Sequence, residues 1–295
     1  EKLLSLLLVI VLLAVPLASC KKQEKKEKIQ QSFNAYMDQL FVEEFHDDAI
    51  SINFFLKNSS KFNLENEGID LNIPTKEEFN DSYVKTLNDL DYIKNNFPYD
   101  YLTEEQKLTY DIVVDLLNRN LNLKDFYYYQ TSLGSYLGIN SQLPMILSEM
   151  RFDTKADIET YFEALRMTQG AFESCIRLEK EKVDFGTSLP DFILLKVVEQ
   201  CNNFIESGDE IFLIPVMNSK IEAATYLSDS EKIILKGINE TLVNENFRNA
   251  YIYLREEAMS LIGKGANQKS MYYLPEGKEY YKALFAESTG CNESI

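Results

Sequence analysis

Apolar residues recur every three or four positions through most of this chain, and this spacing limits the fold more than any other feature. It predicts amphipathic helices at 28–46, 75–95, 103–122, 143–150, 155–182, 192–207, 228–247 and 246–262. Only 11 glycines occur in 295 residues, and no short β-branched runs alternate with helices. The sequence therefore predicts an all-α, mostly helical fold, and it disfavours the two α/β lobes of a solute-binding protein.

Hydroxyl residues mark several of the predicted helix starts. Thr75 and Thr103 are each followed three positions later by Glu or Gln, which is the pattern of a capping box. Asp153 or Thr154 is expected to cap the next long helix. The inner face of the helix at 103–122 is expected to carry Leu108, Ile112 and Leu116.

The segment 126–140 interrupts the helical spacing. It contains Tyr127–Tyr129 and two glycines, and we expect either an irregular crossing or one short extended segment, which would be the minor β element of the fold. The 18 tyrosines and 18 phenylalanines, with no tryptophan, indicate a core built on rings. The tyrosines at 127–129 and 272–273 could instead line a cleft.

The beginning of the chain has the features of an export signal. Leu3–Leu17 is an apolar run too short for a permanent membrane span, and small residues follow it before Cys20. This order resembles the lipobox of bacterial lipoproteins. The resemblance implies that residues 1–19 are a signal peptide, that cleavage falls between Ser19 and Cys20, and that Cys20 carries the lipid. Because the chain starts with Glu1 rather than Met, we expect its true start to be missing.

Three parts therefore follow one another in the expected organisation: the signal peptide, a lipidated and lysine-rich tether at 20–28, and a helical domain at 29–295. The expected location is outside the cytoplasmic membrane, and membrane lipid is the partner through Cys20. The net charge of −17 repels phosphates, and no basic cluster interleaved with aromatic residues offsets it. Nucleic acid is therefore not expected as a partner.

The count of histidines excludes several kinds of catalytic site. His46 is the only one, so a His-Glu-x-x-His zinc motif cannot occur in this chain. The acidic run around His46 is interpreted as a solvated turn, and we assign no catalytic residue and no metal ligand. Cys175 and Cys201 could form a disulfide, although buried free thiols are favoured.

A short segment near the end resembles a family signature. Residues 272–281 read Tyr-Tyr-Leu-Pro-Glu-Gly-Lys-Glu-Tyr-Tyr and are followed by Ser288–Gly290. This stretch is similar to one found in the bacterial family called domain of unknown function 885, and the order of the preceding helices is similar too. From this resemblance we expect a cleft to be lined by Leu274, Pro275, Gly277, Tyr280 and Tyr281.

Members of that family resemble helical zinc metallopeptidases whose metal motif follows the signature. The resemblance implies that this chain, which ends at Ile295, is the N-terminal half of a peptidase-like hydrolase and lacks its metal site. Zinc is expected in the full-length parent and no cofactor in this chain. The expected partners are a peptide substrate and the missing C-terminal half. The alternative is a non-catalytic surface lipoprotein that binds peptides or glycans.

Overall fold

The structure is a computed structural model that describes residues 2–64, 67–207 and 211–291, with side chains from residue 22 onward. Within these residues the backbone forms helices and no strand, and its one β feature is an isolated antiparallel bridge between Asp48 and Ile69. The prediction of an all-α fold is confirmed. Contacts divide the chain into two units, Glu1–Glu44 with Asp81–Asn122, and Phe45–Asn80 with Leu123–Ile295.

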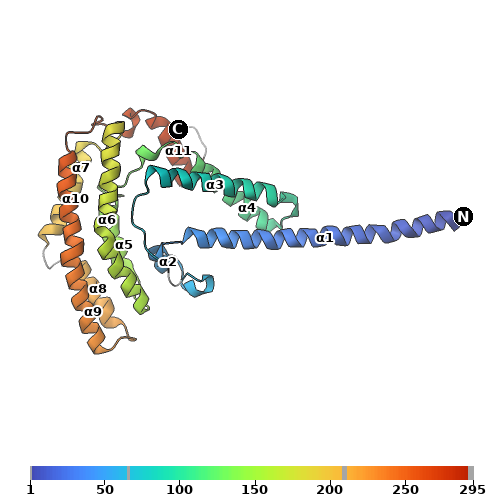
Figure 1. Ribbon diagram of the computed structural model, residues 1–295, viewed down its shortest axis with the longest axis horizontal. Helices are drawn as coiled ribbons and strands as arrows, with labels where there is room; N and C mark the ends of the chain where they lie inside the picture. The colour runs from blue at the N-terminus through green and yellow to red at the C-terminus, as the bar shows by residue number, and fades with distance from the viewer. Residues whose placement is uncertain (1, 65–66, 208–210, 292–295) are drawn as a thin grey trace. The chain divides into compact units, whose positions relative to one another are not determined.

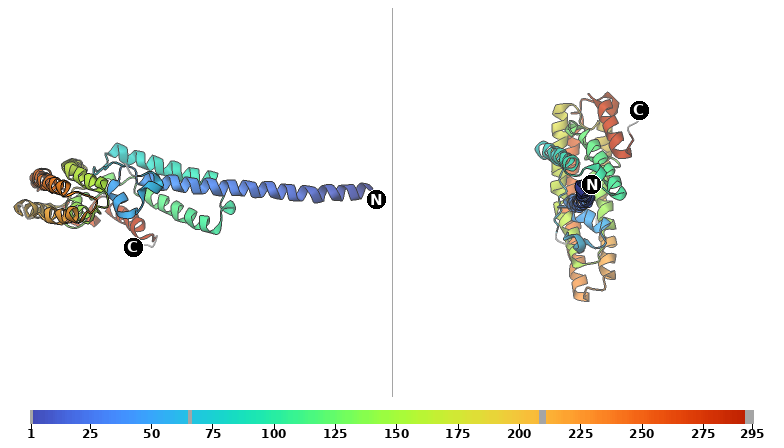
Figure 2. Two further views of the ribbon diagram at one scale, coloured as in Figure 1. Left: turned by 90° about the horizontal axis from the view of Figure 1, so that it is seen from below. Right: turned by 90° about the vertical axis from the view of Figure 1, so that its right-hand side faces the viewer.

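The first unit is built from three helices and a short 3-10 turn. They are α1 (Lys2–Glu44), the part of α3 (Lys76–Asn96) from Asp81 onward, η2 (Tyr99–Tyr101) and α4 (Glu104–Leu121). Figure 2 shows α1 running along the hairpin that α3 and α4 form. Its core consists of Phe33, Ile93, Phe97 and Leu102.

The face of α4 that packs inward differs from the predicted one. Leu108, Ile112 and Leu116 are more than half exposed, so the prediction of the inner face was wrong. The helix carries a second apolar stripe, and it is this stripe that packs against the core of the unit, through Tyr110, Val113, Val114 and Leu117.

Helix α1 extends through the region predicted as a tether. Its exposed side chains pair one turn apart, since Lys28 Nζ lies 2.8 Å from Glu24 Oε1 and Gln23 donates to Glu27 at 3.0 Å, and such pairs favour helix. Ser19 and Cys20 lie in the helical range, but their side chains are outside the described ones. Where side chains are described, no helix combines the length and apolarity needed to cross a bilayer.

The second unit holds the larger core. After α2 (Ala49–Phe55) and η1 (Ser59–Phe62) come η3 (Tyr127–Tyr129), α5 (Ile139–Glu149), α6 (Lys155–Phe185), α7 (Asp191–Glu206), α8 (Leu213–Ala223), α9 (Asp229–Leu242), the π-helical segment η5 (Val243–Phe247), α10 (Arg248–Leu261), η6 (Met271–Tyr273) and α11 (Gly277–Thr289). Figure 1 shows α6 and α10 running side by side, with α7 packed on α10.

Several boundaries differ from the predicted ones. Helix α5 begins four residues early because Asn140 bonds both the N–H and the C=O of Gly134 and so closes the preceding loop. Helix α8 was not predicted. Helix α7 begins at Asp191, one residue before the predicted start, and Pro190 is its N-cap. The segment 126–140 takes the irregular form, a 3-10 turn followed by a loop.

A buried ion pair joins three segments of the second unit. Lys182 Nζ lies 2.7 Å from Glu179 Oε1, and both side chains are almost completely buried. Lys182 also donates to the carbonyl of Gln130, and Glu179 accepts the N–H of Leu189. The pair therefore holds the loops after η3 and α6 against α6 itself. Nearby in the same core, Cys175 and Cys201 are buried free cysteines.

A candidate ligand pocket between η6 and α11

The signature segment forms a tight turn from η6 into α11. Glu276 takes a left-handed conformation with φ 50°, and Gly277 N donates to Leu274 O at 3.1 Å. A Cβ on Gly277 would stand 1.9 Å from Met271 O, a distance no side chain can tolerate. Glycine is therefore required at position 277 because the start of α11 lies directly on the backbone of η6.

Tyr280 anchors α11 to the core. Its ring is buried, with its centroid 5.2 Å from that of Tyr129 and 5.3 Å from that of Phe126. Tyr129 completes the attachment by donating its hydroxyl to Pro275 O. Burial raises the pKa of the Tyr280 hydroxyl, and the Glu287 carboxylate adds to that shift. These contacts fix the turn and leave the next tyrosine, Tyr281, pointing away from the core.

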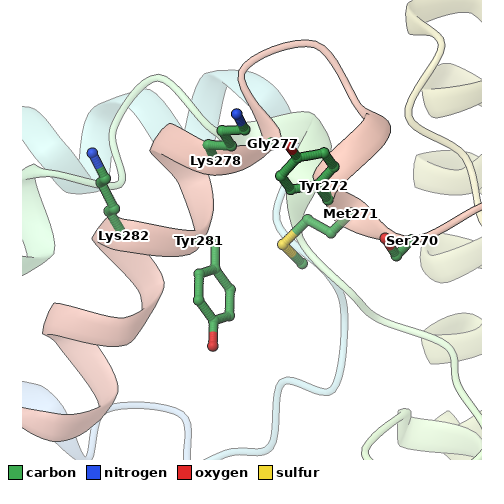
Figure 3. A pocket seen from close by; sticks show the side chains of 7 residues that line it. All are labelled: Ser270, Met271, Tyr272, Gly277, Lys278, Tyr281 and Lys282. Carbon is green, nitrogen blue, oxygen red and sulfur yellow. The ribbon is translucent and has the colours of Figure 1, made fainter. Parts of the chain in front are cut away.

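An open cavity of about 590 Å³ lies between η6 and α11. This η6–α11 pocket is large enough for a small molecule or for two or three peptide residues. Figure 3 shows its lining, with Met271 and Tyr272 coming from η6 and Tyr281 and Lys282 from α11. The lining residues are Ser270, Met271, Tyr272, Gly277, Lys278, Tyr281 and Lys282.

One ammonium group lies over a tyrosine ring in this pocket. Lys278 Nζ lies 4.6 Å from the centre of the Tyr272 ring, and Tyr272 packs edge to face on Tyr273 at 5.2 Å. The attraction between an ammonium and a ring face holds Lys278 beside the apolar surface. Apart from the charges, the lining offers the thioether of Met271 and the Tyr281 ring. Chemically, the pocket can hold apolar groups and an anion, and it contains no carboxylate.

The structure separates the predicted cleft residues into two groups. Gly277 and Tyr281 line the pocket. Leu274, Pro275 and Tyr280 do not, and instead shape the turn or attach it to the core.

The two tyrosine-rich segments singled out in the sequence also differ. Tyr127 and Tyr129 are buried in the core, with exposed fractions of 2% and 5%, whereas Tyr272 and Tyr273 are 60% and 59% exposed. Met271, Lys278 and Lys282 also line the pocket, and no sequence motif marked them as site residues. The one available signal was local charge, because the segment 264–282 holds four lysines against two glutamates in an acidic chain.

The single histidine lies in an exposed turn after α1. Its Nδ1 is 3.0 Å from Glu67 Oε2 and its Nε2 is 3.3 Å from Asp47 Oδ2. Among the described residues these three form the one His/Cys/Asp/Glu group whose ligand atoms lie close together. The group does not fit a zinc site of the His-Glu-x-x-His type, which needs two imidazoles one helical turn apart. His46 is also 74% exposed at its side chain, with no buried shell to orient it.

Fold and site together define an all-α protein that presents an aromatic and basic pocket on a Pro-Glu-Gly turn. The family model described as bacterial protein of unknown function (DUF885) matches residues 69–294 of this chain. Because the match covers most of its length, the chain belongs to this family.

A solved structure shares the fold. The crystal structure of a protein from Colwellia psychrerythraea, described as a lipoprotein, matches with a TM-score of 0.72 and 13% sequence identity. The match covers 90% of this chain and 47% of the other, so this chain spans about half the length of that protein. No curated protein matches this chain.

Proposed function

We propose that this chain is a lipid-anchored protein of the bacterial envelope that binds peptides in the η6–α11 pocket. The pocket itself carries the proposal, because its lining combines exposed tyrosines, a methionine and two lysines. Tyrosine and methionine surfaces bind apolar side chains, and ammonium groups bind carboxylates. Peptides offer both kinds of group a few ångströms apart.

Binding of peptides can be tested with a labelled probe. A fluorescein-labelled Ala-Phe-Ala-Phe peptide is titrated with the purified chain, and fluorescence anisotropy reports binding. Tyr272→Ala with Tyr281→Ala should weaken binding by roughly tenfold, since each ring contributes about 0.5–1.5 kcal/mol beyond its buried area. Tyr273→Ala is the matched control, because Tyr273 is equally exposed but outside the lining. Binding of chito-oligosaccharides in place of any peptide would favour the glycan alternative.

The lipid anchor is proposed at Cys20. Support comes from the apolar run that precedes it and from the lysine-rich stretch that follows. Cells that express the chain are grown with radioactive palmitate. Label is expected on the wild-type protein and not on Cys20→Ser. Label that persists on Cys20→Ser would rule out this attachment site.

We propose further that in the longer proteins of this family this helical part is the scaffold of a zinc-dependent peptidase. The observation in favour is that the match in fold covers only 47% of the length of the solved Colwellia protein. The zinc ligands are then supplied by the rest of such a protein, since His46 and its neighbours do not fit the site. The purified chain should bind zinc no more tightly than an unrelated protein of equal charge. Tight, stoichiometric zinc in this chain would contradict the assignment.

A further inference from the structure

The η6–α11 pocket carries two positive charges within a chain of net charge −17. Lys278 and Lys282 both line it and stand one helical turn apart on the same face of α11. In the described part of the chain, neither lysine forms an ion pair with a carboxylate. The fold therefore leaves the charge in this pocket uncompensated, although acidic residues outnumber basic ones elsewhere.

The start of α11 adds to the positive character of the pocket. Glu276 is the N-cap, but its side chain accepts no hydrogen bond from the first turn. Gly277 N donates to Leu274 O, but a helix start without a side-chain cap still carries a partial positive charge of roughly half a unit from the helix dipole. Gly277 and Lys278, the first two residues of the helix, line the pocket, whereas Glu279 does not.

Apolar surface lies directly beside these charges. The Tyr272 ring is in contact with the Lys278 ammonium at 4.6 Å, and Met271 and Tyr281 complete the wall. Such a pairing selects a ligand that carries its negative charge next to an apolar side chain. A polyanion is a poor fit, because the remainder of the chain repels phosphate-rich ligands.

We infer that the pocket recognises a carboxylate of a bound peptide, with the neighbouring side chain packed on Tyr272 and Tyr281. This inference rests on the proposed peptide binding and adds the chemical class of the peptide. The carboxylate can belong to the C-terminus or to an acidic side chain, and both present the same pair of oxygens to Lys278 and Lys282. The ammonium groups bind the carboxylate of the peptide, and the tyrosine rings bind the apolar side chain next to it.

Four labelled peptides distinguish the two sources of the carboxylate. Ala-Phe-Ala-Phe is compared as free acid and as C-terminal amide, and Ala-Glu-Phe-amide is compared with Ala-Gln-Phe-amide. Binding to the full chain is measured by anisotropy at low and high salt. Within at least one pair, the charged member should bind about tenfold more tightly at low salt, as a charge-assisted contact at a partly open site allows. This difference should shrink as salt screens the charges.

Two double variants test the lysines. Lys278→Ala with Lys282→Ala should abolish the difference between charged and neutral peptides. Lys264→Ala with Lys269→Ala removes the same charge from the same segment, outside the pocket lining, and should preserve it. Equal binding of charged and neutral peptides, or equal losses in the two variants, would overturn the carboxylate while leaving peptide binding intact. Failure of all four peptides to bind would instead overturn the proposed function.

Discussion

The turns η3 and η6 have similar composition and backbone but opposite surroundings. Each is a three-residue 3-10 helix with adjacent tyrosines, and each has a lysine over a ring, Lys76 at 4.7 Å from Tyr128 and Lys278 at 4.6 Å from Tyr272. In η3 Tyr127 and Tyr129 are buried and Tyr128 is partly buried, whereas in η6 both tyrosines are more than half exposed. An aromatic turn is therefore buried or exposed according to what packs over it. The sequence of the turn alone does not determine which of the two occurs.

The largest contrast should come from removing one ring from each turn. Tyr129→Ala should lower the free energy of unfolding by roughly 3–5 kcal/mol, because it empties a buried site that Tyr280 and Phe126 also line. Tyr273→Ala, at the same position of the exposed turn, should change it by less than about 0.5 kcal/mol. Urea unfolding measures both. Similar losses would show that η6 is covered by packing as η3 is.

A smaller effect is expected at the glycine that places η6. Gly277→Ala should destabilise the protein by about 1–3 kcal/mol, because its Cβ meets Met271 O and must push η6 away from α11. Gly237→Ala is the matched control, since nothing lies within 4 Å of its Cβ in the middle of α9. That change should be neutral or stabilising. If thermal unfolding shows both variants unchanged, the close approach at Gly277 is wrong.

The hydroxyl of Tyr129 should contribute less than its ring. Tyr129→Phe removes the bond to Pro275 O, which connects the core turn to the start of α11, and should cost about 0.5–1.5 kcal/mol. Tyr273→Phe should have no measurable effect on urea unfolding. Peptide binding gives a second readout, because loosening the attachment of Pro275 should also lower the affinity for the labelled peptide. Unaltered stability and binding in Tyr129→Phe would argue against this connection.

The smallest effect appears only in alkaline solution. Burial raises the pKa of the Tyr127 and Tyr129 hydroxyls above their ordinary value of 10.0, and for Tyr129 the carboxylates of Glu276 and Glu279 add to the shift. The unfolded chain therefore loses these protons first. Their stabilising contribution is complete below pH 10 and falls as pH rises through the raised pKa.

The double variant Tyr127→Phe with Tyr129→Phe should accordingly lose less stability than the wild type between pH 9 and 11. The urea midpoint at each pH gives the comparison. Tyr272→Phe with Tyr273→Phe serves as the control from the exposed turn and should follow the wild-type curve. Identical pH profiles for all three proteins would mean that η3 is as accessible to water as η6.

Local signals explain which helices the sequence could predict. Thr103, Thr154 and Ser228 form capping boxes, and the helices they cap begin where they were predicted, to within one residue. The starts of α5 and α8 have no side-chain cap, so neither carries the capping signal that marks the other helices. Helix α4 carries apolar residues on two faces, and only tertiary packing selects the buried one.

The candidate site was predictable only in part. The turn could be located because Pro275 and Gly277 impose it locally. The pocket could not, because it forms when the backbone of η6 lies against α11 and brings Lys278 over Tyr272. The sequence likewise could not show that Glu67 lies beside His46, since the two residues are 21 positions apart.

The Glu179 and Lys182 pair restricts how this sequence can change over time. Both side chains are buried, and each also forms a hydrogen bond with the backbone of a separate loop. Losing either one alone would leave an unpaired charge in the core, at a cost of about 3–5 kcal/mol. Replacing both by apolar residues of similar volume leaves no unpaired charge and costs less, although the Gln130 carbonyl and the Leu189 N–H then lose these partners. Among relatives, positions 179 and 182 should therefore mutate together, and a lineage that has lost one charge should have lost the other.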